Sequence, residues 1–339
     1  MREVRALIVV DGRCVGEAPP FTVDVPWWNE VETVTAHLDA ALGVTAAVLR
    51  LVSTTGRFGR DGTTTYEVEV DRTPAGLSTV DHELTDHPRR LPWAKPGGPA
   101  DLLAWAGPHE RAVQVKTWNL SCVYRLRQAG ETRWLKAVPP FQVDEGEVIP
   151  MVAEVDPGLV PPLLAAEDRR VLLADVPGHD CWRPDEAVIR DVLPRWVAVQ
   201  AALAGPPRLR ELGFPVPDFG LPPKTVLHGD FHPGNWRSSG VVLDWSDAHW
   251  GHPALDIGRL LSFTPEDLWP LIEDVWADAW LTHRPDSDPR AALRHARPQN
   301  HRMLAVVYQG FLDAIEPSER VYHEGDVEEE LRTAQSFAV

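Results

Sequence analysis

Three polar residues in the second half of the chain have the types and the spacing that phosphoryl transfer requires. Asp230 lies in the string HGDFHPGNW at residues 228–236, where its carboxylate can orient an attacking hydroxyl or accept its proton. Asn235 follows five residues later and can reach a metal ion from the same loop. Asp244 comes nine residues further on, after the turn RSSG and an expected strand VVLDW, and offers a second oxygen ligand for Mg²⁺. Two such ligands separated by one short hairpin can converge on a single ion.

Each of these residues also has a structural explanation when it is considered alone. An aspartate beside a glycine commonly forms a turn, and Asn235 can cap a helix. The whole string HGDxHxGN, followed by an apolar stretch and an aspartate, is far more specific than its parts. His228 and His232 have the four-residue spacing of a helical zinc pair, but the glycines and the proline between and after them disfavour a helix there. We therefore expect structural histidines and a catalytic Asp230.

The string HGDFHPGNW, together with VVLDWSDAHWGHPALDIGRL, resembles the catalytic segment of the aminoglycoside phosphotransferase and choline kinase superfamily. The resemblance extends over about residues 110–315 and implies a protein-kinase-like fold with ATP as the phosphoryl donor. It further implies that Asp230 is the catalytic base and that Asn235 and Asp244 bind magnesium. In the same family an aspartate of the GHPxxD type, here Asp256, braces the catalytic loop.

The resemblance also assigns roles to residues that precede the catalytic segment. Lys136, in the expected third strand TRWLKAV, would bind the α- and β-phosphates, and the apolar residues around it favour a buried position. Glu145, at the start of the next helix, would pair with this lysine, although Glu147 and Glu154 are competitors.

Two further segments would contact the nucleotide if the resemblance holds. The turn TWNLSCV would cover the phosphates, with Asn119 and Ser121 as donors, although it lacks the GxGxxG of protein kinases. After the strand VLLADVPG, backbone groups of Ala174 and Val176 would bind adenine at the hinge.

The elements that must position these residues indicate an α+β protein with a sheet-rich N-lobe, a helical C-lobe and a small preceding domain. In residues 1–95, a strand RALIVV is followed by a helix from Val31 to Leu42 that Gly43 ends, and by the strands AAVLRLV and TTYEVEV. This order distantly resembles a Nudix domain, but the helix AHLDAALG lacks the glutamates of the metal site. We therefore expect a non-catalytic accessory or dimerising domain.

The Pro- and Gly-rich stretch at residues 86–99 predicts a linker to the kinase-like part. The N-lobe is expected over residues 108–176, with strands AVQVKTW, CVYRLRQ and WLKAV, a helix at 145–154 and a strand RRVLLADV. The C-lobe is expected over residues 177–339. Its helices are predicted at 185–204, 254–263, 265–283 and 301–315.

Composition excludes several other classes of function. The chain has 50 acidic and 33 basic residues and a net charge of -17, which repels nucleic acid and anionic membranes. This charge mildly favours a cationic substrate, although solubility alone explains it. Cys14, Cys122 and Cys181 lack metal-ligand spacing and indicate reduced thiols. The N-terminal apolar run is too short for a signal peptide or a spanning helix, so we expect a cytoplasmic protein.

The sequence thus predicts an ATP- and Mg²⁺-dependent phosphotransferase whose acceptor is a hydroxyl on a small polar or cationic molecule. An aminoglycoside-like antibiotic, an amino sugar and an amino alcohol are all candidates, and Asp247, His249 and acidic residues of the last helices could contact them. A nucleotide-binding regulatory module, a pseudokinase, is the alternative, because only about fifty residues separate Gly178 from His228, where relatives have a longer helical segment. Residues 1–95 are expected to be dispensable for nucleotide binding, since every assigned ATP contact lies beyond them.

Overall fold

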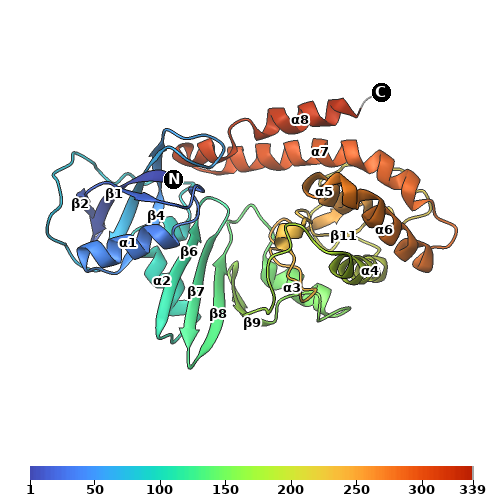
Figure 1. Ribbon diagram of the computed structural model, residues 1–339, viewed down its shortest axis with the longest axis horizontal. Helices are drawn as coiled ribbons and strands as arrows, with labels where there is room; N and C mark the ends of the chain where they lie inside the picture. The colour runs from blue at the N-terminus through green and yellow to red at the C-terminus, as the bar shows by residue number, and fades with distance from the viewer. Residues whose placement is uncertain (338–339) are drawn as a thin grey trace. The chain divides into compact units, whose positions relative to one another are not determined.

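The computed structural model describes residues 1–337 and divides into two compact units (Figure 1). The first unit holds Met1–Phe141 and Gly310–Glu324, and the second holds Gln142–Gln309 and the described residues from Gly325 onward. Sheets dominate the N-terminal region and helices the C-terminal part, which confirms the predicted α+β class. The three-part division with boundaries near residues 95 and 176 stays a prediction.

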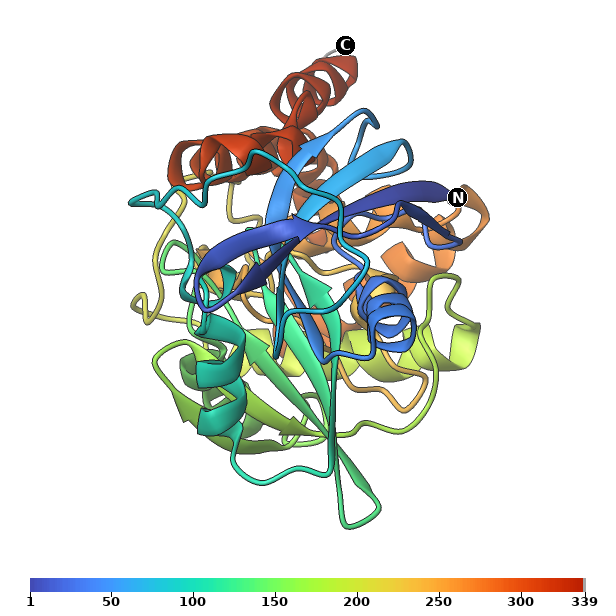
Figure 2. The same cartoon turned by 90° about the vertical axis from the view of Figure 1, so that its left-hand side faces the viewer.

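The N-terminal sheet has the order β2-β1-β5-β4, and β3 pairs with β1. Strands β1 and β5 are parallel, and the other pairs are antiparallel. Helix α1, Glu32–Leu42, ends where Gly43 adopts a left-handed conformation with a φ of 64°, as the glycine stop predicted. Figure 2 looks onto these strands, with α1 beside them. The strands are β1 Arg2–Val10, β2 Arg13–Glu17, β3 Phe21–Val23, β4 Ala46–Thr54 and β5 Thr63–Val70.

Hydrogen bonds join the second sheet of the first unit directly to the N-terminal sheet. The amide of Gln114, on β6, accepts from the Val48 N–H at 2.8 Å and donates to the Val48 carbonyl at 2.9 Å. Val31 N–H donates to the Val115 carbonyl at 3.1 Å, so the start of α1 is attached to the same strand. The antiparallel strands here are β6 Arg111–Thr117, β7 Cys122–Gln128 and β8 Glu131–Ala137.

The segment predicted as a linker contains regular structure and buried charge. It includes the 3₁₀-helix η1, Pro92–Ala94, and the first residues of α2, Gly98–Ala106. Arg90 is buried and pairs with Glu316 at 2.9 Å, and Glu316 precedes the 3₁₀-helix η4, Pro317–His323. The linker prediction was wrong because the Pro and Gly residues here start short helices instead of leaving the chain extended.

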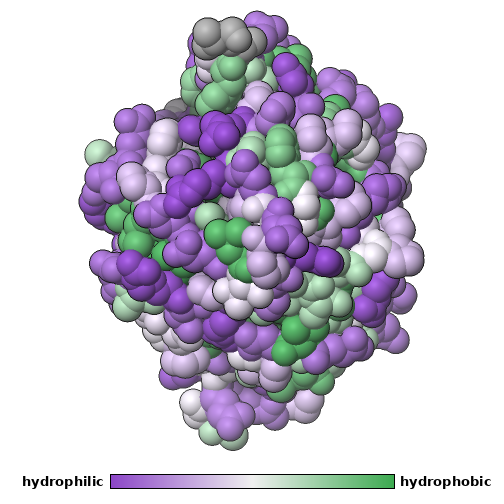
Figure 3. Space-filling view, turned by 90° about the vertical axis from the view of Figure 1, so that its right-hand side faces the viewer, coloured by the Kyte–Doolittle hydropathy of each residue, from purple (hydrophilic) through white to green (hydrophobic). Residues whose placement is uncertain are grey.

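The second unit is a helical domain with two small strand pairs. Its core is rich in tryptophan, including Trp196, Trp236, Trp245 and Trp276, each fully buried. The face in Figure 3 is mostly hydrophilic, with scattered hydrophobic residues. The helices are α3 Glu145–Ala153, α4 Glu186–Ala202, α5 Ala254–Phe263, α6 Trp269–His283, α7 Pro289–Ala314 and α8 Asp326–Ser336. The strands are β9 Leu163–Glu167, β10 Arg170–Ala174, β11 Thr225–Leu227 and β12 His249–Gly251, and the 3₁₀-helices are η2 Pro233–Asn235 and η3 Glu266–Leu268.

Two predicted elements of this unit differ from the structure. The stretch VVLDW forms no strand and contributes only a single bridge between Val242 and Trp236. Helix α7 begins at Pro289, twelve residues before the predicted start, and continues through Pro298. Its early turns are held by packing on α5, where the Asn300 amide donates to the Leu255 carbonyl at 2.9 Å. None of the helices in the described part of the chain is long and apolar enough to cross a membrane.

Replacing Gln114 with alanine is expected to destabilise the protein by about 1–3 kcal/mol, because the buried N–H and C=O of Val48 would lose their partners. Urea unfolding measures the loss. Gln335→Ala, at an exposed position of α8, is the control and should unfold like the unmodified protein. Equal stability of both variants would show that Gln114 does not hold the two sheets together.

Candidate active site

The loop that carries Asp230 leaves the end of β11 in a conformation that requires glycine. Gly229 has a φ of 86°, and a Cβ atom there would lie 2.1 Å from the Asp247 carbonyl oxygen. His232 then caps the short helix η2, because its Nδ1 accepts the Gly234 N–H at 3.0 Å. The loop backbone is thus fixed at both ends of the Asp230 position.

A buried carboxylate on α5 holds the first part of this loop. Asp256 accepts the backbone N–H groups of His228 at 3.0 Å and of Gly229 at 3.1 Å. It also accepts the Trp196 indole N–H at 3.0 Å and the Gln200 amide at 3.3 Å. Burial raises the pKa of Asp256 to about 7, against the effect of the N–H donors. This is the bracing contact expected for Asp256.

The same contacts show what the short segment before the catalytic loop supports. Helix α4 is its one helix, and Trp196 and Gln200 are its donors to Asp256. Gln200 also donates to the Val226 carbonyl on β11 at 3.2 Å. One helix therefore supports both the brace and the strand that leads into the loop.

Asp230 is surrounded by donors on both of its carboxylate oxygens. Oδ1 accepts Nε and Nη2 of Arg259, each at 2.8 Å. Oδ2 lies 3.3 Å from His232 Nε2 and 3.4 Å from the amide nitrogen of Asn235, which also donates to the Asp230 carbonyl at 3.0 Å. Burial opposes ionisation here, but the Arg259 guanidinium and His232 hold the pKa of Asp230 well below its usual range.

Sequence reasoning missed Arg259 as a residue of this site. It lies three residues after Asp256 on α5, so the two side chains are neighbours on one face of the helix. Its guanidinium also lies 4.4 Å from the centre of the Phe263 ring. An arginine among the apolar residues of DIGRLL was the available signal, because a buried arginine needs a partner.

His232 has a defined tautomer and a stacked environment. Since Nδ1 accepts the Gly234 N–H, the proton of the neutral ring lies on Nε2, which faces Asp230. The ring stacks between Trp182, with centroids 5.4 Å apart, and Phe263, at 4.7 Å. The histidine is therefore a fixed donor to Asp230, and a helical zinc pair with His228 does not form.

The two predicted metal ligands lie on one irregular hairpin. Leu243 N–H donates to the Asn235 carbonyl at 2.8 Å, which places Asp244 one residue beyond that pair. Asp244 has a φ of 65°, and the Ser246 hydroxyl donates to its Oδ1 at 3.0 Å. The amide nitrogen of Asn235 is bonded to Asp230, so its Oδ1 is the atom suited to a cation. These hard oxygen donors fit Mg²⁺.

Among the three candidate glutamates, only Glu145 is buried. Glu147 and Glu154 are exposed, whereas the Glu145 carboxylate accepts the Trp245 N–H at 2.7 Å, directly after Asp244. Glu145 belongs to the second unit. Lys136 is buried on β8 of the first unit, and its pairing with Glu145 stays a prediction.

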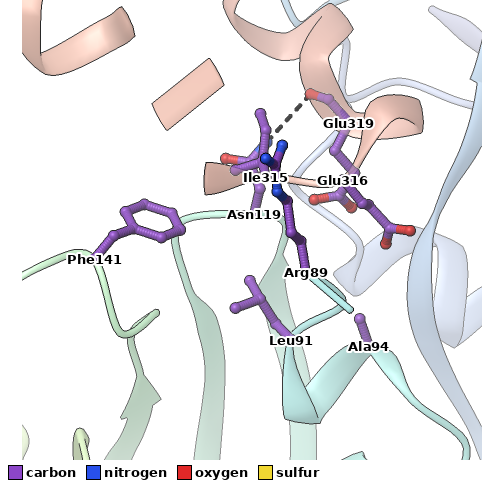
Figure 4. Close-up of a pocket in the computed structure, with 8 residues that line it drawn as sticks. All are labelled: Arg89, Leu91, Ala94, Asn119, Phe141, Ile315, Glu316 and Glu319. Atoms are coloured by element: carbon purple, nitrogen blue, oxygen red, sulfur yellow. Dashed lines mark hydrogen bonds between the residues drawn. The ribbon is translucent and has the colours of Figure 1, made fainter. Parts of the chain in front are cut away.

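The side chains of the turn between β6 and β7 are engaged within the first unit. Asn119 donates to the Glu319 carbonyl at 3.3 Å and lies 3.0 Å from His323 Nε2. It lines a cavity of about 10 Å³ (Figure 4), which holds one water molecule at most. Ser121 accepts the Trp118 indole N–H at 3.1 Å. Both polar atoms of the Asn119 side chain are thus engaged, whereas the Ser121 hydroxyl still has a proton to donate.

The remaining predicted residues belong to the second unit. Ala174, at the end of β10, donates its N–H to the Pro162 carbonyl at 2.9 Å, so its carbonyl is the group suited to adenine. Val176 follows two residues later and is buried. Asp247 accepts the Gln142 amide at 3.0 Å. His249 is buried, and burial lowers its pKa to about 4, so a contact between His249 and a substrate is not favoured.

Comparison with known proteins finds one family match and several similar solved structures. Residues 209–293 match the model of the phosphotransferase enzyme family, and no curated protein matches the chain. Among solved structures, the choline/ethanolamine kinase family protein from Mesorhizobium loti has 12% identity and a TM-score of 0.49, with 71% of this chain and 94% of that chain covered. The macrolide 2'-phosphotransferase MphH from Brachybacterium faecium has 18% identity and a TM-score of 0.46, with 68% and 98% covered.

These identities and TM-scores are too low to carry the substrates of the two enzymes over to this chain. The family match covers His228, Asp230, Asn235, Asp244 and Asp256, and it supports the predicted class of enzyme, a phosphotransferase. The resemblance predicted from the sequence is therefore confirmed for the segment that holds the catalytic motif. Residues 209–293 match the model of the phosphotransferase enzyme family.

Proposed function

We propose that the protein is an ATP- and Mg²⁺-dependent phosphotransferase that moves the γ-phosphate to a hydroxyl of a small polar or cationic molecule. The observation that carries this proposal is the environment of Asp230, whose loop is braced by Asp256 and whose carboxylate is held by Arg259, His232 and Asn235. A carboxylate fixed in this way has a defined direction for a substrate hydroxyl. The cytoplasmic location stays a prediction.

Asp230 acts in this proposal mainly by positioning the acceptor. Because its pKa is held low, it is a weak base towards a free alcohol. The acceptor oxygen forms its bond to the γ-phosphorus while the bond from that phosphorus to the β–γ bridging oxygen breaks. The hydroxyl proton passes to Asp230 late, when the forming bond has made it acidic, which suits the loose transition state of phosphoryl transfer.

The nucleotide phosphates would be bound by the residues that the family resemblance assigns. Lys136 would contact the phosphates and Glu145 would orient it, while backbone groups near Asn119 and Ser121 would cover them. Asn235 and Asp244 would hold Mg²⁺, which neutralises phosphate charge when it is bound.

Adenine would lie against the backbone of Ala174 and Val176. In the described part of the chain no three or more His, Cys, Asp or Glu residues converge as metal ligands. This is compatible with a cation whose other ligands are phosphate oxygens and water.

The surroundings of Asp230 favour a cationic acceptor. Glu330, on α8, acts electrostatically on Arg259, and Asp326 and Glu330 act on the half-buried Tyr308. Acidic groups of the last helix thus lie near the proposed catalytic loop. An amino sugar or an amino alcohol would have its charge balanced there.

Asp230→Asn is expected to leave the affinity for Mg·ATP nearly intact while kcat falls by about 10²-fold, the usual effect of losing a positioned acid–base group. Asp244→Ala should weaken nucleotide binding as well as turnover, with partial recovery at high Mg²⁺, because Asp244 would hold the metal. Calorimetry of ATP binding at two Mg²⁺ concentrations separates these results. Rates would be measured with a panel of aminoglycosides, amino sugars and amino alcohols.

Loss of ATP binding to the same extent in both variants, without dependence on Mg²⁺, would show that the two roles are misassigned. Full activity of Asp230→Asn would contradict the phosphotransferase proposal itself. ATP binding without turnover on any acceptor of the panel would favour the regulatory module instead.

Lys136→Ala is expected to lower kcat/KM by about 10²-fold and to weaken ATP binding, the scale seen when a preorganised donor to developing charge is lost. Glu145→Ala should have a smaller effect, because Glu145 would act through the lysine. Lys116→Ala on β6 and the exposed Glu147→Ala on α3 are the controls, measured by steady-state kinetics. A larger effect of Glu147→Ala than of Glu145→Ala would refute the assignment.

Turnover is expected to fall as the pH drops through about 7, since protonated Asp256 can no longer accept all four N–H donors.

The stability of the protein should change in the opposite direction over the same pH range. A carboxyl whose pKa is raised by folding lowers the free energy of unfolding as the pH rises from its ordinary pKa towards 7. Comparing kcat and urea unfolding of the unmodified protein and Asp256→Asn across this range isolates the group. If kcat of Asp256→Asn fell at low pH as it does in the unmodified protein, Asp256 would not be the cause of the pH dependence.

A further inference from the structure

The first unit contains a second cavity, of about 420 Å³, that none of the assigned residues line. This volume is within the range of pockets that hold small molecules. Its walls come from α1 and α2, from the ends of β4 and β5, and from β6 and β7, all of which lie in the first unit (Figure 1). Residues far apart in the sequence therefore surround one space, including parts of the predicted accessory domain.

The charged groups around this cavity are mostly acidic. One arginine lines it, Arg111. Two of the carboxylates have a basic partner, because Glu32 pairs with Arg125 at 2.6 Å and Asp71 pairs with Arg72 at 2.8 Å. The lining carboxylates are Asp11, Glu32, Asp39, Glu69 and Asp71.

Glu69 and Asp39 differ from Glu32 and Asp71 because neither has an ion-pair partner among the described residues and each accepts a backbone N–H instead. Glu69 is half-buried and accepts the Gly97 N–H at 2.8 Å, and the more exposed Asp39 accepts the Ala46 N–H at 2.8 Å. Within the part of the chain that the structure describes, no basic side chain lies within 4.0 Å of either carboxylate, although the more distant Arg111 guanidinium lowers the pKa of Asp39 in part. Burial raises the pKa of Glu69 and of Asp39, so a nearby positive charge would stabilise both.

A buried phenol provides the second observation. Tyr124, on β7, lines the cavity, is 3% exposed, and its hydroxyl has no hydrogen-bond partner among the described residues. A buried hydroxyl without a partner costs about 1–3 kcal/mol, so such groups are uncommon in folded proteins. Burial raises the pKa of this phenol, and the nearby negative charge of Glu69 raises it further without a hydrogen bond between the two groups. Tyr124 thus lines the cavity, while its hydroxyl oxygen is itself covered by protein atoms.

We propose that this cavity is a binding site for a small organic amine, separate from the candidate active site. The ammonium group would lie beside Glu69 and Asp39, and an apolar body would lie against Pro99, Ala100 and Leu103. An amine fits better than a metal ion. The space is much larger than an ion, and among the residues described no three or more His, Cys, Asp or Glu side chains form a ligand group.

Benzylamine and its neutral analogue benzyl alcohol test the proposal on the full chain. By calorimetry, benzylamine should bind with a Kd of about 1 mM, the scale for a ligand of this size, and benzyl alcohol at least ~10-fold more weakly. Glu69→Gln keeps an acceptor for the Gly97 N–H and should weaken benzylamine binding by about 10-fold. Tyr124→Phe should keep the fold and change the chemical shifts of bound benzylamine in NMR spectra.

Two controls locate the binding. Asp24→Asn, at an exposed position outside the cavity, and Asp230→Asn, in the candidate active site, should bind benzylamine like the unmodified protein. Equal binding of the amine and the alcohol would overturn the proposal, as would equal affinity of Glu69→Gln and the unmodified protein. Absence of saturable binding, or loss of binding in Asp230→Asn, would overturn it too. These outcomes do not depend on phosphotransferase activity.

Discussion

The candidate active site depends on one buried carboxylate. Asp256 accepts two consecutive backbone N–H groups of the catalytic loop and two side-chain N–H groups of α4, so three separate segments meet at its two oxygens. Ionised Asp256 is costly to bury, and these four donors offset only part of that cost, since its pKa stays raised. Because the donors at His228 and Gly229 are backbone groups, the brace fixes the path of the chain itself. The direction of Asp230 follows from that path.

Helix α5 both fixes the catalytic loop and provides a positive charge for Asp230. Asp256 lies in its first turn and Arg259 one turn later, so one rigid element holds the loop and also supplies the cation for Asp230. His232 adds a donor whose proton position is set by Gly234. The contacts of Asp230 with Arg259 and His232 both oppose proton uptake by its carboxylate. The arrangement therefore favours an aspartate that orients a hydroxyl over one that removes its proton early.

Local patterns made the main elements of the fold predictable, whereas contacts between distant segments were not. Alternation and the Gly43 stop predicted β5 and α1, because burial on one face leaves a period in the sequence. The pairing of Gln114 with Val48 leaves no such periodic pattern, because the sequence does not distinguish a buried glutamine from an exposed one. For the same reason the motif string identified Asp230 and Asp256 but neither Arg259 nor the donors Trp196 and Gln200 from α4.

Buried ion pairs join the predicted linker to distant segments within the first unit. Arg50 forms a bidentate pair with Glu67 inside the N-terminal sheet, and Glu316, from the far end of the chain, pairs with Arg90 of the predicted linker and lies 4.0 Å from Arg50. These charges are buried, so removing any partner would leave a charge without compensation. Residues 1–95 can therefore be free of nucleotide contacts and still be required for the fold of the sheet that carries Lys136.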